Sequence, residues 1–346
     1  NCAADKPDGG NAPCLFPPVN IPGHKNKGSC RGNVHDNSAE DIISLWATEG
    51  YVAERGYALD LSKLLAGWKY KDQLNEDVLT PFVRKGRIYA LPSNGYIMGL
   101  LYNKKLFKEA GLLDSAGNAQ TPADWDELVA AAKKLTNRKK GISGFGIMGK
   151  DAEAGWGFLN WVWQAGGDFE REKNGAWQAV FDQKEAVEAL EFIRGLRWQH
   201  DVLQATLLAT SQELEARFAS GQIGMMFAAQ DRIPGLVNQY NMKLEDIGVA
   251  LLPAGPASRA NQMGGNYYII NPNRPREVQE AAFKWITWRI LGSMDPERIK
   301  ENGEDCRKQG QISALTALPI FKGETDRKAR EAAAAYKDVL VDFPEV

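Results

Sequence analysis

The stretch GISGFGIMGKD contains two glycine spacings that proteins use to bind phosphate. Gly144, Gly146 and Gly149 match the G-x-G-x-x-G of dinucleotide-binding turns. The step from Gly144 to Lys150 also matches the G-x-x-x-x-G-K of phosphate loops. Both motifs need the order strand, turn, helix, because the phosphate lies at the helix N-terminus. Here a predicted helix precedes the stretch, and Asp151 replaces the Ser or Thr that would hold magnesium. We therefore expect these glycines to mark close backbone approach in a strand.

Paired carboxylates are the groups that would hydrolyse a glycosidic bond, and Glu49 and Asp231 form one such candidate pair. The order of segments suggests neither a barrel nor a known hydrolase layout. The three histidines lack a Ser or Cys in a triad-like setting. We expect no catalysis, and the alternative of a glycan-cleaving enzyme stays open to product analysis with oligosaccharides.

The cysteines are few and irregularly spaced: Cys2, Cys14, Cys30 and Cys306. His24 and His35 lie near the first three, but no C-x-x-C or H-x-x-x-H spacing supports zinc. A disulfide among the first three is expected if the protein is exported, and free thiols are the alternative. We expect no metal and no cofactor.

The composition is that of an ordinary globular protein, and 346 residues suit two domains. A net charge of −2 argues against a nucleic-acid partner, whose phosphates need a basic face. Ten tryptophans are many for this length, which is typical either of large cores or of loops that bind sugar rings. No run of 18 apolar residues exists to span a membrane.

Strand and helix patterns alternate after an irregular N-terminal segment, residues 1–38. The sequence predicts strands in these segments: EDIISLW, GRIYALP, YIMGLLYN, GISGFGIMG, IGMMFAA, DIGVALLPAG and GGNYYIINPN. Between them it predicts helices, the most regular of which are 122–136, about 183–199 and 276–291. This alternation predicts an α/β fold with mostly parallel sheets flanked by helices.

The three long helices carry apolar stripes. For 122–136 we expect Thr121 as the cap, Pro122 at the first helical position and Asp124 as the acid of a capping box. Its stripe consists of the following residues: Trp125, Leu128, Val129, Ala132 and Leu135. The other two stripes are as follows: Val187, Leu190 and Ile193 in the second helix, and Val278, Ala282 and Trp285 in the third.

The order of several segments resembles a known family. EDIISLW, GYALDLSKLL, GRIYALPSNGYIMGLLYNKKLFKEAGL and TPADWDELVAAAKKL, followed by FASGQIGMMF, DIGVALLPAG and MGGNYYIINP, are similar to the extracellular solute-binding proteins of bacterial ABC importers. The likeness points to their carbohydrate-binding, maltose-binding-protein-like branch and covers about residues 39–320. Residues 1–38 match no segment of the family, and its members usually extend beyond the position of Val346.

The resemblance implies two α/β lobes of the periplasmic-binding-protein fold, type II-like, joined by a hinge of crossing strands with the ligand in the cleft. The expected lobes are discontinuous: 39–100 plus 253–303, and 101–252 plus 304–346. This agrees with the rule that ligands of open α/β sheets lie beyond the carboxyl ends of strands.

A sugar site needs aromatic platforms and side chains that both donate and accept hydrogen bonds. Trp46, with Thr48 and Glu49 just beyond it, resembles the family's cleft edge, and lobe core is the alternative for Trp46. Asn94 and Tyr96 follow Pro92 in a loop that faces the cleft in the family, although Asn94 also suits a turn.

The helical segment after GISGFGIMG supplies the leading candidate. Aligning its Gly-Gly pair with the family puts Trp156 at an aromatic sugar platform, with Asn160 as a weaker contact. Trp161 and Trp163 follow, and at least one of them is expected in the core.

The loop after IGMMF departs from the family's Gly-Pro-Trp. Asp231 stands near the place of that Trp, with Gln230 and Arg232 beside it. A carboxylate and an amide can chelate neighbouring hydroxyls, whereas a surface turn with an exposed charge is the alternative.

The segment GGNYY approaches the ligand in the family. It offers the Gly264 and Gly265 amides and the Asn266 side chain. Strand alternation lets only one of Tyr267 and Tyr268 face the cleft, and we take Tyr267.

The resemblance implies a non-enzymatic subunit that captures a sugar or oligosaccharide by hinge closure and delivers it to the membrane permease subunits of an ABC importer. We expect a monomer outside the cytoplasm, in the periplasm or lipid-anchored at the outer face of the membrane. Two alternatives stay open: a non-sugar, charged solute held by Asp231 and Arg232, and a sensor-domain partner.

Overall fold

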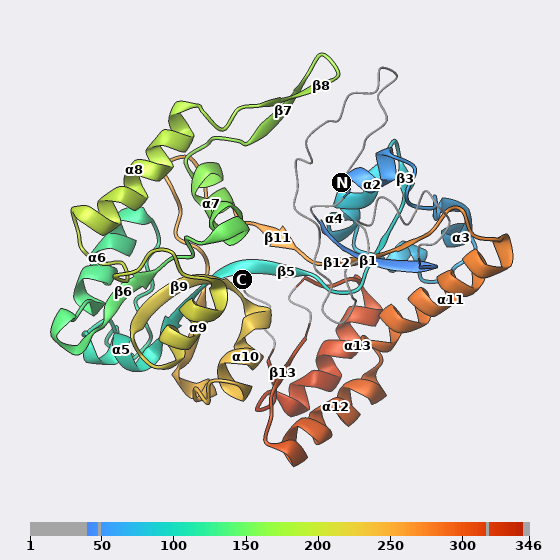
Figure 1. Ribbon diagram of the computed structural model, residues 1–346. Helices are drawn as coiled ribbons and strands as arrows, with labels where there is room; N and C mark the ends of the chain where they lie inside the picture. Colours follow the sequence, from blue (N-terminus) through green and yellow to red (C-terminus); the bar gives the residue numbers. More distant parts are fainter. Residues whose placement is uncertain (1–39, 48–49, 316–317, 342–346) are drawn as a thin grey trace. The chain divides into compact units, whose positions relative to one another are not determined.

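The computed structural model describes residues 40–47, 50–315 and 318–341, which form two compact units (Figure 1). Unit 1 consists of residues up to Lys71, Leu79–Leu91 and Tyr267–Trp288. Unit 2 consists of Asp72–Val78, Pro92–Asn266 and the residues from Arg289 onward. Unit 2 thus includes 72–78, 92–100, 253–266 and 289–303, which the sequence analysis places in the first lobe. The lobe boundaries and the hinge themselves stay predictions.

Unit 1 contains a three-stranded sheet in the order β1–β12–β4. Its strands and the neighbouring hairpin are β1 Ile42–Trp46, β12 Asn266–Ile270, β4 Leu91–Pro92, β2 Val83–Arg84 and β3 Arg87–Ile88. Its helices are α2 Tyr51–Glu54, α3 Ser62–Ala66 and the long α11 Arg276–Gly292, and α4 Glu76–Leu79 begins in unit 2 and ends at Leu79. The strand EDIISLW and the helix-turn-helix after it are confirmed.

The buried face of α11 differs from the predicted one. Ala282, Phe283 and Ile286 are buried, whereas Trp285 is 44% exposed and its ring meets Tyr268 edge-on at 5.5 Å. A Trp can lie on the outer side of a helix because its flat ring packs sideways on a neighbour.

Unit 2 is built on a five-stranded sheet in the order β10–β5–β9–β6, with β11 also paired to β5. Its strands are β5 Tyr96–Asn103, β6 Ser143–Gly146, β9 Ile223–Ala229, β10 Ile247–Ala250 and β11 Met263–Gly264. Its helices are α5 Lys104–Glu109, α6 Trp125–Leu135, α7 Asp151–Gln164, α8 Lys184–Trp198, α9 Ser211–Ala219, α10 Ile233–Asn238, α12 Pro296–Gln309 and α13 Glu324–Ala333. A short parallel pair, β13 Ser313–Ala314 with β14 Leu340–Val341, lies near α12 and α13.

The prediction of mostly parallel sheets is wrong for unit 2. β5 runs antiparallel to β9, β10 and β11, and only β6 with β9 is parallel in this sheet. Alternating strands and helices do not determine strand direction, because a long connection can return the chain to either end of a sheet.

The sheet has helices on both faces. Along β9, Met225 and Phe227 face the core formed with α6, α7 and α8. Met226 and Ala228 face the core formed with α9 and α10. The alternation of side chains along a strand explains why every residue of β9 is buried.

Two predicted helix details need correction. Asp124, rather than Thr121, caps α6: its Oδ1 accepts from the Glu127 N–H at 2.9 Å, and Glu127 Oε2 accepts from the Ala123 N–H at 2.8 Å. On α8 the buried residues are Ala186, Ala189 and Leu196, whereas Val187 and Leu190 are exposed. The small residues face the core that α8 shares with α7.

The glycine stretch is β6, and α7 begins directly after Lys150. The order strand, turn, helix is therefore present, contrary to the prediction that it is missing. The first turn of α7 carries Asp151 and Glu153, whose charges repel an anion. A Cβ at Gly144 would lie 1.9 Å from the Ala132 oxygen of α6, so close packing accounts for this glycine.

A hairpin of β7 Glu170–Lys173 and β8 Ala176–Ala179 projects from the other elements of unit 2 (Figure 1). All eight strand residues are exposed. Asn174 and Gly175 at its tip have φ of 55° and 77°, the left-handed region that a two-residue Asn-Gly turn requires.

Candidate functional site

A polar pocket of about 420 Å³ lies within unit 2. One wall comes from the start of β5 and from the turn after β9: Ser93, Asn94, Gly95, Tyr96 and Asp231. The other wall comes from the end of α11, from α12, β13 and α13, and its polar members are Arg289, Ser293, Arg298, Asn302, Asp326 and Arg330. The pocket therefore joins several hydrogen-bonding and charged groups in one hollow.

Asn94 fastens the first wall to the β11–β12 segment. Its Oδ1 accepts from the Asn266 backbone N–H at 2.7 Å and lies 3.3 Å from the Asn266 amide nitrogen. A Cβ at Gly265 would lie 2.3 Å from the Asn94 carbonyl oxygen, so only glycine allows this approach. The structure thus brings together three predicted site residues: Asn94, Gly265 and Asn266. The hydrogen bonds of the Asn94 side chain to Asn266 also agree with the alternative, in which Asn94 stabilises a turn.

Tyr96 and Trp156 form an aromatic pair beside the pocket. Their ring centroids are 6.4 Å apart, and both side chains are half-buried. The indole Nε1 lies 2.7 Å from the Gln262 amide, which accepts its proton when the amide oxygen faces the ring. Burial, and secondarily the charge of Asp231, raises the pKa of the Tyr96 hydroxyl. The tyrosine therefore stays a neutral donor at physiological pH.

Asn160 is fully buried on α7 and holds the same segment in place. Its Oδ1 accepts from the Gln262 backbone N–H at 2.8 Å. Asn160 does not line the polar pocket, so its position supports a role in fixing Gln262 and, through it, Trp156.

The three side chains of the turn Gln230–Arg232, which follows β9, have different surroundings. Asp231 lines the pocket, where the surrounding protein raises the pKa of its carboxyl despite the opposing charge of Arg232. Arg232 instead donates from Nε to Glu215 Oε1 at 2.6 Å. Gln230 is 3% exposed, and its amide has no hydrogen-bond partner among the described residues.

Arg232 pairs with Glu215 because the Glu215 carboxylate is buried and needs a positive partner. Glu215 is buried on α9, and burial raises the pKa of its carboxyl while Arg232 opposes that rise. A buried carboxylate is tolerated when a guanidinium pairs with it. Arg232 is thus engaged away from the pocket lining.

The remaining predicted residues belong to unit 1 or lie outside the described ranges. Trp46 is 63% exposed at the end of β1. Tyr267 is fully buried, with its ring 4.7 Å from that of Phe82, so no face of it is open to a ligand. Tyr268, on the opposite side of β12, is half-exposed. Thr48 and Glu49, like Cys2, Cys14 and Cys30, lie outside the described residues.

The sequence analysis missed the helical wall of the pocket. Its polar residues come from three consecutive helices and from the turn between the first two, and none of them belongs to a sequence motif. The one available signal was the arginine content of the region from Arg289 to Arg298, where two helices meet.

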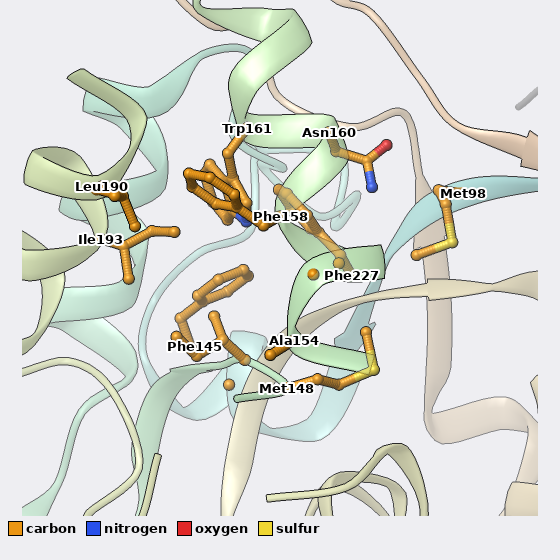
Figure 2. Close-up of a pocket in the computed structure, with 14 residues that line it drawn as sticks. Met98, Phe145, Met148, Ala154, Phe158, Asn160, Trp161, Leu190, Ile193 and Phe227 are labelled. Atoms are coloured by element: carbon orange, nitrogen blue, oxygen red, sulfur yellow. The ribbon is translucent and has the colours of Figure 1, made fainter. Parts of the chain in front are cut away.

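A second hollow in unit 2, the apolar cavity, measures about 320 Å³ (Figure 2). Aromatic and aliphatic side chains line it, among them Phe145, Phe158, Trp161, Phe227, Leu190 and Ile193. Figure 2 shows Phe145 and Trp161 side by side with the two α8 residues opposite them. Met98 and Asn160 lie at its other edge, and Trp161 is confirmed as a core residue.

Residues 35–289 match the family model of the bacterial extracellular solute-binding proteins. The chain belongs to this family. The resemblance inferred from the order of segments is thereby confirmed at the level of the family.

A candidate binding protein of Brucella abortus (strain 2308) is 27% identical to this solute-binding protein over 225 residues, 64% of this chain and 50% of that protein. The chain thus spans about half the length of the curated relatives it matches.

Solved structures show the same fold. An ABC transporter solute-binding protein of Thermotoga lettingae, bound with α-D-tagatose, has a TM-score of 0.70 and 22% identity, over 89% of this chain and 74% of that one. Maltose-bound MalE3 of T. maritima has a TM-score of 0.65 and 24% identity, over 91% and 78%. UgpB of Mycobacterium tuberculosis, in complex with glycerophosphocholine, has a TM-score of 0.67 and 20% identity, over 89% and 72%. The predicted fold class, that of the two-lobed periplasmic solute-binding proteins, is confirmed.

Two features are absent from the described ranges. None of the helices there is long and apolar enough to cross a bilayer. Nor do three or more His, Cys, Asp or Glu side chains gather there as metal ligands.

Proposed function

We propose that the chain captures a sugar or oligosaccharide and delivers it to the permease of an ABC importer without acting on it chemically. The observation that carries this proposal is the polar pocket, where Asn94, Tyr96 and Asp231 meet. An amide, a phenol and a carboxylate together donate to and accept from hydroxyl groups, which are the main polar groups of a sugar.

The aromatic pair supports the same ligand class. Tyr96 lines the pocket, and Trp156 lies against it at the N-terminal part of α7. Flat rings beside hydrogen-bonding groups suit the C–H faces and hydroxyls of a sugar ring. Trp46, Thr48 and Glu49 stay predicted contacts, whereas the buried Tyr267 has no exposed face for a ligand.

Family membership and the ligands named for similar structures point in the same direction. Tagatose and maltose are carbohydrates, whereas glycerophosphocholine is a charged polyol derivative. The alternative in which Arg232 binds a charged solute is weakened because Arg232 pairs with Glu215. The family is extracellular, so we place the chain outside the cytoplasm, and attachment to a lipid anchor and the monomeric state stay part of the proposal.

The test is a thermal-shift and calorimetric screen of the purified chain over sugars, polyols, amino acids and peptides. A ligand at 100 times its Kd adds about 2.7 kcal/mol to the free energy of unfolding, which gives a readily measured rise in Tm. Binding of amino acids or peptides in preference to every sugar and polyol would contradict the proposal, as would shortened oligosaccharides after incubation.

A matched pair of variants locates the site. Trp156→Ala should weaken sugar binding roughly tenfold or more, because the indole supports Tyr96 and offers an apolar face. Trp177→Ala, which removes an exposed indole from the β7–β8 hairpin, should leave the affinity unchanged. Equal affinities of the two variants would remove Trp156 from the site.

A further inference from the structure

The apolar cavity has room for a molecule of its own. It lies wholly within unit 2, measures about 320 Å³, and is lined by residues of β5, β6, β9, α7 and α8 (Figure 2). Four aromatic rings belong to this lining: Phe145, Phe158, Trp161 and Phe227. In another protein, an engineered apolar cavity of about 150 Å³ stays dry and binds benzene, so this volume suits a compound of about two fused rings.

Polar groups at the cavity wall already have hydrogen-bond partners within the chain. Asn160 Oδ1 accepts from the Gln262 backbone N–H at 2.8 Å. The backbone of Ile147 is paired with the buried Gln204 side chain: the Ile147 N–H donates to Gln204 Oε1 at 3.1 Å, and Gln204 Nε2 donates to the Ile147 carbonyl oxygen at 2.5 Å. A polar ligand would lose its hydrogen bonds to water here and gain little in return, so the lining favours an apolar one.

Helix α7 contributes two glycines to the lining, Gly155 and Gly157. Glycine inside a helix is less stable than alanine. Close packing requires neither of them: a Cβ at Gly155 would meet nothing within 4 Å, and one at Gly157 would meet the terminal methyl carbon of Met148 at 3.1 Å. Met148 also lines the cavity, and its flexible thioether can move aside. The two glycines therefore leave space at the cavity wall, at a cost to the helix.

The cavity wall reaches the surface on α8. Leu190 lines the cavity and is 55% exposed. Ile193, nearly one turn further along the helix, also lines it and is partly buried. An apolar ligand can thus enter beside Leu190, and its burial would remove apolar surface of both partners from water.

We infer that the apolar cavity is a second ligand site, which binds a small apolar aromatic compound of about two fused rings. Phe145, Trp161 and Phe227 contact the faces and edges of these rings, the arrangement that aromatic groups prefer. Leu190 and Ile193 cover the ligand from α8. The site is separate from the polar pocket, and the inference does not rest on the proposed function.

The test is titration calorimetry and thermal melting of the purified chain with toluene, indole and naphthalene. Naphthalene and indole should raise the Tm with increasing concentration, because a ligand that binds only the folded state stabilises it. Naphthalene should bind about tenfold tighter than toluene, since a single ring leaves part of the apolar lining uncovered.

Two matched pairs of variants locate the ligand. Ala154→Leu fills part of the cavity and should weaken naphthalene binding about tenfold, whereas Ala152→Leu, at an exposed position of the same helix outside the lining, should not change it. Leu190→Ala removes an apolar contact and should weaken binding about threefold, whereas Val187→Ala, at a similarly exposed position of α8 outside the lining, should not. The second pair changes exposed residues, so it decides the location even if Ala154→Leu does not fold.

The inference is wrong if none of the three compounds raises the Tm, or if naphthalene binds no tighter than toluene. It is also wrong if folded Leu190→Ala and Ala154→Leu bind naphthalene as well as their controls do, because the ligand then lies elsewhere. None of these results bears on sugar binding, which is measured with different ligands. Failure of every sugar to bind would in turn contradict the proposed function and leave this inference standing.

Discussion

The two hollows of unit 2 adjoin the same strand and differ in nearly every other respect. Tyr96 of β5 lines the polar pocket, and Met98, two residues further and on the same side of the strand, lines the apolar cavity. The polar pocket is lined by charges and amides, and the apolar cavity almost only by aromatic and aliphatic side chains. A hollow binds a hydroxylated solute only if its lining can replace the hydrogen bonds that the solute loses to water.

A chain of contacts separates the two hollows. Asn160 at the edge of the apolar cavity binds the Gln262 backbone, Gln262 meets the Trp156 indole, and Trp156 lies against Tyr96. The residues at the edge of the apolar cavity therefore help to hold Trp156 and, through it, Tyr96 of the polar pocket.

The largest expected effect concerns the apolar cavity. Phe145 is fully buried and packs against Trp161 and Phe227. Phe145→Ala should lower the free energy of unfolding by about 3–5 kcal/mol, because it removes a buried ring and enlarges the cavity. Urea unfolding measures this loss. Calorimetry on the folded fraction should give an unchanged affinity for sugars, and a large drop would assign the solute to this cavity instead.

A smaller effect of opposite sign is expected at Gly155. This residue lies in α7 and lines the apolar cavity, and a Cβ there would meet nothing within 4 Å. Gly155→Ala should raise the free energy of unfolding by about 1 kcal/mol, because alanine is the better helix former. Gly144→Ala is the contrasting control, since its Cβ would collide with α6 and should destabilise the fold. A destabilised Gly155→Ala variant would show that this glycine has another role.

The smallest effect is a pH dependence at Asp231 in the polar pocket. The pocket keeps water from the carboxyl of this otherwise exposed residue and so raises its pKa in the folded chain, which means that the folded state holds the proton more tightly than the unfolded one. The unfolding free energy of the wild type should therefore fall, relative to that of Asp231→Asn, as the pH rises from about 3.9 through the raised pKa. Above the raised pKa, the unfolding free energy of the wild type should fall no further relative to that of Asp231→Asn.

Melting curves of wild type and variant between pH 3 and 8 measure this difference. The exposed Asp182→Asn serves as the control, because its side chain lies in the turn before α8 and outside the pocket lining. A difference in Tm between wild type and Asp231→Asn that is constant over this range would contradict the assigned cause.

Much of the fold followed from local patterns. The apolar runs of β5 and β9 predicted buried strands with the observed bounds, because a fully buried strand needs apolar residues on both faces. Strand direction did not follow, since it depends on the long connections. The faces of α8 and α11 were also misjudged, because two of the three buried residues on α8 are alanines rather than large side chains.

The candidate site could be predicted only on its strand wall. Asn94, Tyr96 and Asp231 each follow or begin a recognisable strand, so their positions were readable from the sequence. Arg289 and Arg298 line the same pocket because the Arg298 side chain folds back against the backbone of Gly292 at the end of α11, which no local pattern predicts. The sequence also could not show which side of β12 faces the core. Side chains alternate along a strand, so one of the two tyrosines must be buried, and the packing against Phe82 shows that it is Tyr267.

The projecting β7–β8 hairpin offers a practical consequence. Its eight strand residues bury no side chain, and its Asn174–Gly175 tip needs only a short left-handed turn. Extra residues can be inserted at such a tip, because no core residue and no third strand of the described chain packs against it. A fluorescent domain spliced between Asn174 and Gly175 would leave the strands of unit 2 uninterrupted, so the fusion could label the folded chain without disturbing either hollow.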